Sequence, residues 1–495
     1  MSFSSVQFLI FFPIVVILYF LIPYKLRWIW LLIASYYFYI SYNPKYVALI
    51  FTTTIITYII GLLMEKANLI KDKKRSIKVK KFLVFLSVSS NIGILALFKY
   101  YNFFSTSLIH FFSKFNISVH MPTFDFLLPV GISFYTFQAL SYTIDVYRQD
   151  VKVEKNLGRY ALFVSFFPQL LSGPIQKSKN FIHQIDERHY FDYNRVKNGV
   201  ILMMWGYFQK TMVADRIGQL VNTVYSSPGN YKGFEIVIAT VFFGFQLYCD
   251  FSAYSNIAIG AAQVMGFSLS KNFERPYFSK SIREFWRRWH MSLTSWFMDY
   301  LYFPLGGSRC SKLRKHFNVM VVFVISGLWH GAGFTFLIWG LLHGTYYIIE
   351  DMLKPVKNKF IKRFNIKTNI FIYKLIQVII TFGLVDFAWL FFRANSFKSS
   401  LVLIKNMVYF NPEIFINGSL YKLGLDHLNF LVAILSLVIV LIVDLFQRRE
   451  GISNKLLTKN IVFRWSLYLA SVLIILIFGA YGSDYNVEQF IYSQF

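Results

Sequence analysis

Charged residues are scarce in this chain. Asp, Glu, Lys and Arg make up 15% of its 495 residues, against about 25% in an ordinary soluble domain, whereas 56% are apolar and 20% are aromatic. This composition excludes an ordinary soluble globular protein. Because the apolar segments run almost end to end with short polar joints, we predict one membrane-embedded domain over residues 1–495.

Acidic residues are scarcer than basic ones. Lys and Arg outnumber Asp and Glu by 51 to 24, which gives a formal charge of +27. An excess of this kind also suggests nucleic-acid binding, but here the basic residues stand in loops between apolar stretches. We therefore interpret them as topology signals and contacts to membrane lipids, and we expect no nucleic-acid partner.

Several catalytic signatures are missing. The two cysteines, Cys249 and Cys310, fit no metal or disulfide pattern, and the sequence contains neither His-Glu-x-x-His nor a Cys/His cluster. A Gly-x-Ser-x-Gly elbow and a phosphate-binding Gly-x-x-x-x-Gly-Lys loop are also absent. We expect no metal, no bound cofactor, no nucleophilic serine and no nucleotide hydrolysis.

Long apolar runs are the dominant feature. A membrane-spanning helix needs about 20 residues, and the runs predict an all-α polytopic membrane protein with about ten to twelve transmembrane helices. The long runs lie near 6–23, 45–64, 82–99, 125–145, 232–266, 317–350, 371–394, 428–447 and 462–481, with shorter ones near 28–41 and 158–175.

The basic loops predict the orientation. No cation precedes the first apolar run, whereas Lys25 and Arg27 follow it, which is the reverse of a cleavable signal peptide. We expect this segment to stay, with the N-terminus outside. The positive-inside rule places the basic stretches 66–81, 354–367 and 448–464 in the cytoplasm, and the tail 482–495 outside.

Residues 270–316 break the pattern of spans. They mix aromatic residues with many cations and a few acids, which no lipid-facing span holds. Irregular backbone at membrane depth requires cover from protein or a water-filled cavity, so we predict buried or re-entrant helices on the cytoplasmic side. Pro276, Pro304, Gly306 and Gly307 supply the breaks.

Two histidines stand out as candidate functional residues. His330 lies inside an apolar run, in Ser326-Gly-Leu-Trp-His330-Gly-Ala-Gly333, where an ionisable side chain is a functional-site hypothesis by default. A core histidine bonded to a neighbouring helix is the alternative. His290 follows Arg287 and Arg288, which bind either phosphate or the headgroup region, and the whole stretch also fits a solvated helix face.

The central region, 246–343, resembles membrane-bound O-acyltransferases, in the branch of alginate and peptidoglycan O-acetyltransferases. The resemblance is carried, in the family's order, by Gln246-Leu-Tyr-Cys-Asp250-Phe-Ser-Ala-Tyr254, Asn272-Phe-Glu-Arg-Pro-Tyr277, Phe285-Trp-Arg-Arg-Trp-His290-Met-Ser-Leu-Thr-Ser-Trp296, Asp299-Tyr-Leu-Tyr-Phe-Pro304-Leu-Gly-Gly307 and Gly327-Leu-Trp-His330-Gly331. The resemblance implies a helical fold with a central tunnel around His290 and His330.

The resemblance also implies roles for individual residues. His330 matches the family's catalytic histidine, and His290 matches a second polar site in the same tunnel. Asp250 and Trp329 are candidate supporting residues, although an aspartate bonded to local cations is an equal interpretation of Asp250. Arg283, Arg287 and Arg288 are candidates to attract the donor's phosphates.

The C-terminal residues Phe490-Ile-Tyr492-Ser-Gln-Phe495 resemble the aromatic tail of some acyl-transfer systems. By this resemblance, Tyr492 accepts the acyl group and presents it to an extracytoplasmic partner. An interfacial aromatic anchor is the alternative, since Tyr and Phe are common at membrane boundaries.

The function implied is transfer of acetyl from cytoplasmic acetyl-CoA, a substrate, toward a polysaccharide acceptor outside a bacterial cytoplasmic membrane. The final step is expected to need a separate SGNH/esterase-like transferase as partner. Three alternatives remain at this point: D-alanyl transfer to teichoic acid from a carrier-protein thioester, a transporter, and a scaffold in which His330 is dispensable. A transporter predicts internal repeats, which the sequence lacks.

Overall fold

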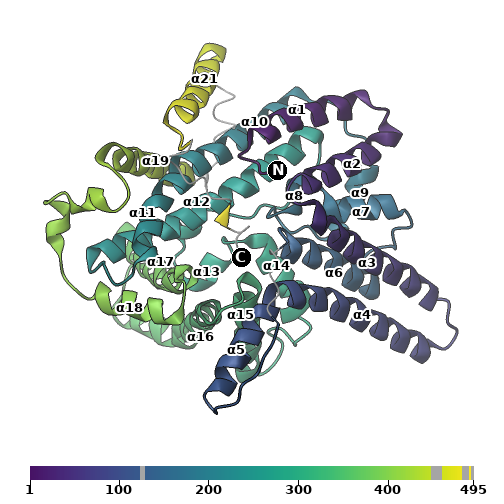
Figure 1. The fold of residues 1–495 in the computed structure, drawn as a ribbon, viewed down its shortest axis with the longest axis horizontal. Helices are drawn as coiled ribbons and strands as arrows, with labels where there is room; N and C mark the ends of the chain where they lie inside the picture. The colour runs from purple at the N-terminus through teal and green to yellow at the C-terminus, as the bar shows by residue number, and fades with distance from the viewer. Residues whose placement is uncertain (123–128, 447–459, 482–489, 492–495) are drawn as a thin grey trace. The chain divides into compact units, whose positions relative to one another are not determined.

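The chain is helical throughout the part that the computed structural model describes, which is residues 1–122, 129–446, 460–481 and 490–491 (Figure 1). Within those ranges there is no β-strand, so the predicted all-α class is confirmed. The described residues form two compact units. Unit 1 contains residues 1–203 and 255–270, and unit 2 contains residues 204–254 and 271–491.

Unit 1 is organised around helix α6, whose residues are almost all buried and against which α3, α4, α7 and α9 pack. Two of its polar side chains bond to neighbouring segments: Asp145 accepts a hydrogen bond from Ser178 at 2.9 Å, and Tyr142 accepts one from the Glu154 N–H at 3.1 Å. The helices of unit 1 are α1 (Val6–Leu21), α2 (Arg27–Ile40), α3 (Val47–Ala67), α4 (Lys73–Leu95), α5 (Tyr101–Ser113), α6 (Ile132–Arg148), α7 (Leu157–Ser165), α8 (Phe167–Leu170), α9 (Ser178–Asp186) and parts of α10 (Tyr193–Tyr207) and α12 (Phe234–Met265).

Unit 2 combines long helices with short buried ones. Helix α16 packs against α15 and α17, and the five-residue helix α13 contacts both α16 and α17. Besides the remaining parts of α10 and α12, its helices are a π-helical stretch (Phe208–Ala214), α11 (Asp215–Ser226), α13 (Ile282–Trp286), α14 (Met291–Phe297), α15 (Lys312–His330), α16 (Phe334–Arg363), α17 (Phe371–Arg393), α18 (Phe397–Met407), α19 (His427–Phe446) and α21 (Ile461–Phe478). The predicted interruption of residues 270–316 into short helices is confirmed.

Six described segments are long and apolar enough to cross a membrane. They differ in how much protein covers them: the most apolar window of α21 is 0% buried by protein, so its large side chains face the surroundings, whereas that of Phe234–Met265 is 78% buried. The six segments are Pro44–Ala67, Lys73–Ser113, Phe234–Met265, Phe371–Arg393, His427–Phe446 and Ile461–Phe478. The other predicted spans fall on shorter or more charged helices, so the count of ten to twelve stays a prediction.

The apolar run 317–350 forms two helices. It is divided between α15 and α16, and the break lies at 331–333, directly after His330. The backbone is extended at Gly331, and the Phe336 ring packs against it so closely that a Cβ there would lie 2.1 Å from the ring. Helix α15 therefore ends with His330 at its last position, where the side chain is buried at 3% exposure.

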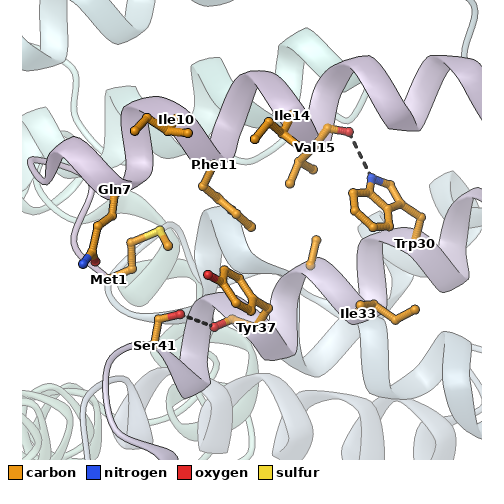
Figure 2. A pocket seen from close by; sticks show the side chains of 11 residues that line it. Met1, Gln7, Ile10, Phe11, Ile14, Val15, Trp30, Ile33, Tyr37 and Ser41 are labelled. Carbon is orange, nitrogen blue, oxygen red and sulfur yellow. Dashed lines mark hydrogen bonds between the residues drawn. The ribbon is translucent and has the colours of Figure 1, made fainter.

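Unit 1 contains an apolar groove of about 600 Å³ between α1 and α2 (Figure 2). Phe11 and Ile14 of α1 line it opposite Ile33 and Tyr37 of α2, and the indole N–H of Trp30 donates to the Val15 carbonyl at 3.0 Å. None of the predicted site residues lines this groove.

Helices α15 and α16 run side by side in very close contact (Figure 1). The approach is possible because glycines face each other: a Cβ on Gly327 would lie 2.4 Å from the Phe336 carbonyl oxygen, and one on Gly340 would lie 2.4 Å from the Phe323 carbonyl oxygen. Real Cβ atoms do not approach backbone this closely, so both positions require glycine for packing.

We expect Gly340→Ala to destabilise the protein by about 1–3 kcal/mol, because the new methyl group must push the two helices apart. The matched control is Gly383→Ala on α17, where nothing lies within 4 Å of the added Cβ. Thermal unfolding in detergent measures both variants. Equal melting temperatures for the two would contradict the packing argument.

Candidate active site

The side chain of Asn272 organises the buried segment that carries His290. Its Oδ1 accepts hydrogen bonds from the Ser292 N–H at 3.3 Å and from the Ser292 hydroxyl at 2.7 Å, and it lies 3.2 Å from Nδ1 of His290. The Met291 N–H donates to the backbone carbonyl of Asn272 at 2.9 Å. These bonds tie the start of α14 to the loop before α13 and give His290 a fixed place.

The same network determines the tautomer of His290. A backbone N–H can only donate, so the Asn272 atom that faces Ser292 is the oxygen, and the nearby Nδ1 of His290 carries the proton. The lone pair of the neutral ring is then on Nε2. Burial at 0% exposure lowers the pKa of His290 to about 3, so the ring is neutral near pH 7.

The backbone of His290 is strained, with φ of 43° in the left-handed region that few residues other than glycine adopt. Strain of this kind costs about 1–3 kcal/mol and persists only where surrounding contacts enforce it. Here the bonds to Asn272 enforce it. The strain marks His290 as a residue whose orientation is held rather than one that fills a core.

His330 lies beside His290, with 6.5 Å between the ring centroids. Trp329 contacts both rings, at 6.0 Å from His290 and 4.9 Å from His330. Trp339 at 5.0 Å and Phe392 at 5.4 Å stand edge to face against His330. The structure therefore brings three predicted site residues together in one aromatic enclosure, where two imidazoles can contact the same small group away from bulk water.

A cavity of about 330 Å³ opens in the same unit. Arg283, Arg287 and Lys315 contribute cationic side chains to its lining, and much of the rest is apolar, from α14 and α15. Trp286 is part of the wall and stacks edge to face on Trp339, 5.7 Å away, which in turn contacts His330. The Trp339 indole therefore connects the cavity wall at Trp286 with His330.

Asp351 anchors two of the cavity's cations. It accepts from Lys315 at 2.6 Å and from Arg283 at 2.7 Å, with His316 at 3.1 Å. These hydrogen bonds, that of Lys315 first, hold the pKa of the Asp351 carboxyl well below its usual range. Glu350 also interacts with Arg283, but two carboxylates do not neutralise Arg283, Arg287 and Lys315, so this side of the cavity keeps a positive charge.

The remaining predicted residues lie elsewhere. Arg288 is not among the residues that line the cavity, and its guanidinium pairs with Glu284 at 2.5 Å. Asp250 pairs with Lys210 at 2.7 Å, which matches the alternative interpretation of an aspartate bonded to a local cation. Tyr492 lies outside the described residues.

Comparison with known proteins assigns the family. A family model for the membrane-bound O-acyltransferases matches residues 153–397, a range that includes both histidines of the pair. The probable alginate O-acetylase AlgI of Pseudomonas aeruginosa is 36% identical over 83% of this chain and 75% of its own length. The peptidoglycan O-acetyltransferase of Helicobacter pylori is 32% identical over 77% of this chain and 74% of its own length. A more distant relative, the teichoic acid D-alanyltransferase of Streptococcus thermophilus, is 30% identical over 45% of this chain and 56% of its own length.

The chain belongs to the membrane-bound O-acyltransferase family. It is accordingly a multi-pass membrane protein and an O-acyltransferase, as the sequence resemblance implied. Within the described residues, no group of three or more His, Cys, Asp or Glu side chains is arranged to hold a metal ion.

Among the described residues of unit 2, a third buried histidine was not among the residues predicted from the sequence. His343 on α16 is 0% exposed, and its Nδ1 accepts from the indole N–H of Trp286 at 3.3 Å. Its ring also lies 5.0 Å from Trp339. The signal was present, because Gly340-Leu-Leu-His343-Gly344 repeats the pattern Gly327-Leu-Trp-His330-Gly331 thirteen residues later.

We expect His343→Phe to destabilise the protein by about 1–3 kcal/mol, because it leaves the buried N–H of Trp286 without its acceptor. His343→Asn should retain part of this stability, since its amide oxygen lies near the place of Nδ1. Thermal unfolding in detergent compares the two. A phenylalanine variant as stable as wild type would show that the hydrogen bond to Trp286 contributes nothing.

Proposed function

We propose that this O-acyltransferase takes acetyl from acetyl-CoA at the cytoplasmic face and delivers it for O-acetylation of an extracytoplasmic polysaccharide. The relatives support the acetyl group and the acceptor class, since they are named for O-acetylation of alginate or peptidoglycan. The single observation that carries the chemistry is the buried pair of His290 and His330, 6.5 Å apart within an aromatic enclosure.

The cavity beside this pair suits a coenzyme A thioester. Its cationic side, from Arg283, Arg287 and Lys315, attracts phosphates, and its apolar lining accepts an uncharged arm. Both features occur together in one cavity. Its wall residue Trp286 contacts Trp339, which in turn contacts His330. The predicted role of Arg288 in donor binding is not part of this proposal, because that residue pairs with Glu284.

The chemical step is attack of a hydroxyl oxygen on the thioester carbonyl carbon. The new C–O bond forms, the C–S bond breaks, and the hydroxyl proton passes through His330 to the departing thiolate, so that coenzyme A leaves as a thiol. His290, with a lone pair on Nε2, accepts a hydrogen bond and orients the reacting group. Enclosure by Trp329, Trp339 and Phe392 limits hydrolysis by water.

The acetyl group then leaves the chain for its acceptor. We propose that Tyr492 receives it as the first hydroxyl and that a separate SGNH/esterase-like transferase carries it to the polysaccharide. The basic loops support this direction, since the positive-inside rule predicts the donor side inside the cell, and the N-terminus and the tail outside a bacterial cytoplasmic membrane.

D-alanyl transfer is the second candidate. The D-alanyltransferase of Streptococcus thermophilus matches 45% of this chain, against 83% for the alginate relative, so the comparison favours acetyl. Membership of an acyltransferase family sets aside the transporter and the scaffold.

We expect His330→Ala to slow release of coenzyme A from acetyl-CoA by at least about 10²-fold, because general acid–base catalysis typically contributes 10²–10⁴-fold. The purified full chain in detergent is assayed by thiol release. The control is His183→Ala, which changes a histidine whose side chain is 58% exposed.

Two results would contradict the proposal. One is a His330→Ala variant that is as fast as wild type. The other is a wild-type protein that leaves acetyl-CoA intact and consumes only a D-alanyl carrier-protein thioester.

A further inference from the structure

A buried cluster of charges lies in unit 2, formed by side chains that the proposed chemical step does not use. Lys210 Nζ is 2.7 Å from Asp250 Oδ1 and 2.8 Å from Asp215 Oδ1, and all three side chains are at most 5% exposed. The ammonium group of Lys210 balances only one of the two carboxylates, so these three buried side chains carry an excess negative charge in the protein interior. Such a cluster requires further donors, because burying a charge without them is costly.

The C-terminal segment supplies one of these donors. The backbone N–H of Ile491 donates to Asp250 Oδ2 at 2.7 Å, so each oxygen of that carboxylate has a partner. The Phe490 ring lies 4.5 Å from Lys210 Nζ, and it stands edge to face on Tyr254 at 4.8 Å. Phe490 and Ile491 are only 5% and 6% exposed. Two residues of the tail therefore occupy a built site.

Residues near Lys210 also bind the chain just before the tail, at Phe478 and Ala480. The Ala480 N–H donates to the carbonyl of Thr211 at 3.0 Å, and Arg216 donates to the Phe478 carbonyl. Thr211 belongs to the π-helical stretch Phe208–Ala214, which also carries Lys210. The π-helix, a form often found at functional sites, thus holds both the end of α21 and the tail.

We propose that Lys210, Asp215, Asp250 and Tyr254 form a latch that binds the C-terminal segment through Phe490 and Ile491, and that this docking is needed for acyl transfer to the tail. The inference rests on the proposed function in one respect, namely that Tyr492, the next residue in the sequence, receives the acetyl group. It assigns Asp250 a role that the sequence did not predict: it is a positioning residue for the tail.

The first test measures docking without any substrate. Hydrogen–deuterium exchange of the C-terminal peptide of the full chain reports protection of the Ile491 amide. We expect protection in wild type, and exchange at least about tenfold faster in Asp250→Asn and Phe490→Ala, because hydrogen bonds to charged groups are among the stronger ones. Phe490→Ala leaves the ion cluster intact and therefore keeps the test valid if Asp250→Asn misfolds.

The second test measures transfer. Mass spectrometry after incubation with acetyl-CoA is expected to find at least about tenfold less acetyl on the C-terminal peptide in Phe490→Ala, while Phe463→Ala, a change at a 55% exposed residue of α21, behaves as wild type. Unprotected Ile491 in wild type, or equal exchange in all variants, would overturn the latch. Faster exchange with unchanged acetylation would overturn its role in transfer.

The two tests separate the latch from the proposed function. If wild type fails to consume acetyl-CoA, the proposed function fails, and the exchange measurement still decides whether the tail docks on Asp250.

Discussion

Burial of polar rings among indoles is the constraint on which unit 2 depends. An imidazole without water must find its hydrogen-bond partners within the protein. His290 is hydrogen-bonded to Asn272, and His343 accepts a hydrogen bond from the N–H of Trp286. Each of these bonds also fixes a neighbour: the first ties the start of α14 to the preceding loop, and the second holds a wall of the cationic cavity. The two rings are therefore held in place through their Nδ1 atoms.

The close contact of α15 and α16 makes this burial possible. With glycine at 327 and 340, the two helices approach until backbone touches backbone, and His330 and His343 both contact Trp339. Larger residues at these positions would separate the helices and admit water. The aromatic enclosure and the cavity depend on the same packing.

Much of the fold and part of the site could be predicted from the sequence. Apolar run lengths indicated the helices, and charges within 270–316 indicated a buried, interrupted segment, because lipid excludes such residues. His290 and His330 were identified by motif, and the structure places them together. Their catalytic roles stay predictions.

Other features depend on contacts that no local pattern contains. Asp250 and Ile491 are 241 positions apart, so their hydrogen bond follows only from the folded chain. Arg287 and Arg288 are adjacent and chemically identical, yet Arg287 lines the cavity while Arg288 pairs with Glu284 one helical turn away. The length of the apolar run 317–350 does not show that it forms two helices, although the glycines at the break are visible in the sequence.

The central claim is that His290 and His330 act on one reacting group. A double-mutant cycle on coenzyme A release from acetyl-CoA tests it most directly, with His290→Ala, His330→Ala and the double variant. If the two rings serve one step, the double variant should be about as slow as the slower single variant, since residues that act as a unit are not additive. Losses that multiply in the double variant would show two independent contributions and contradict the account.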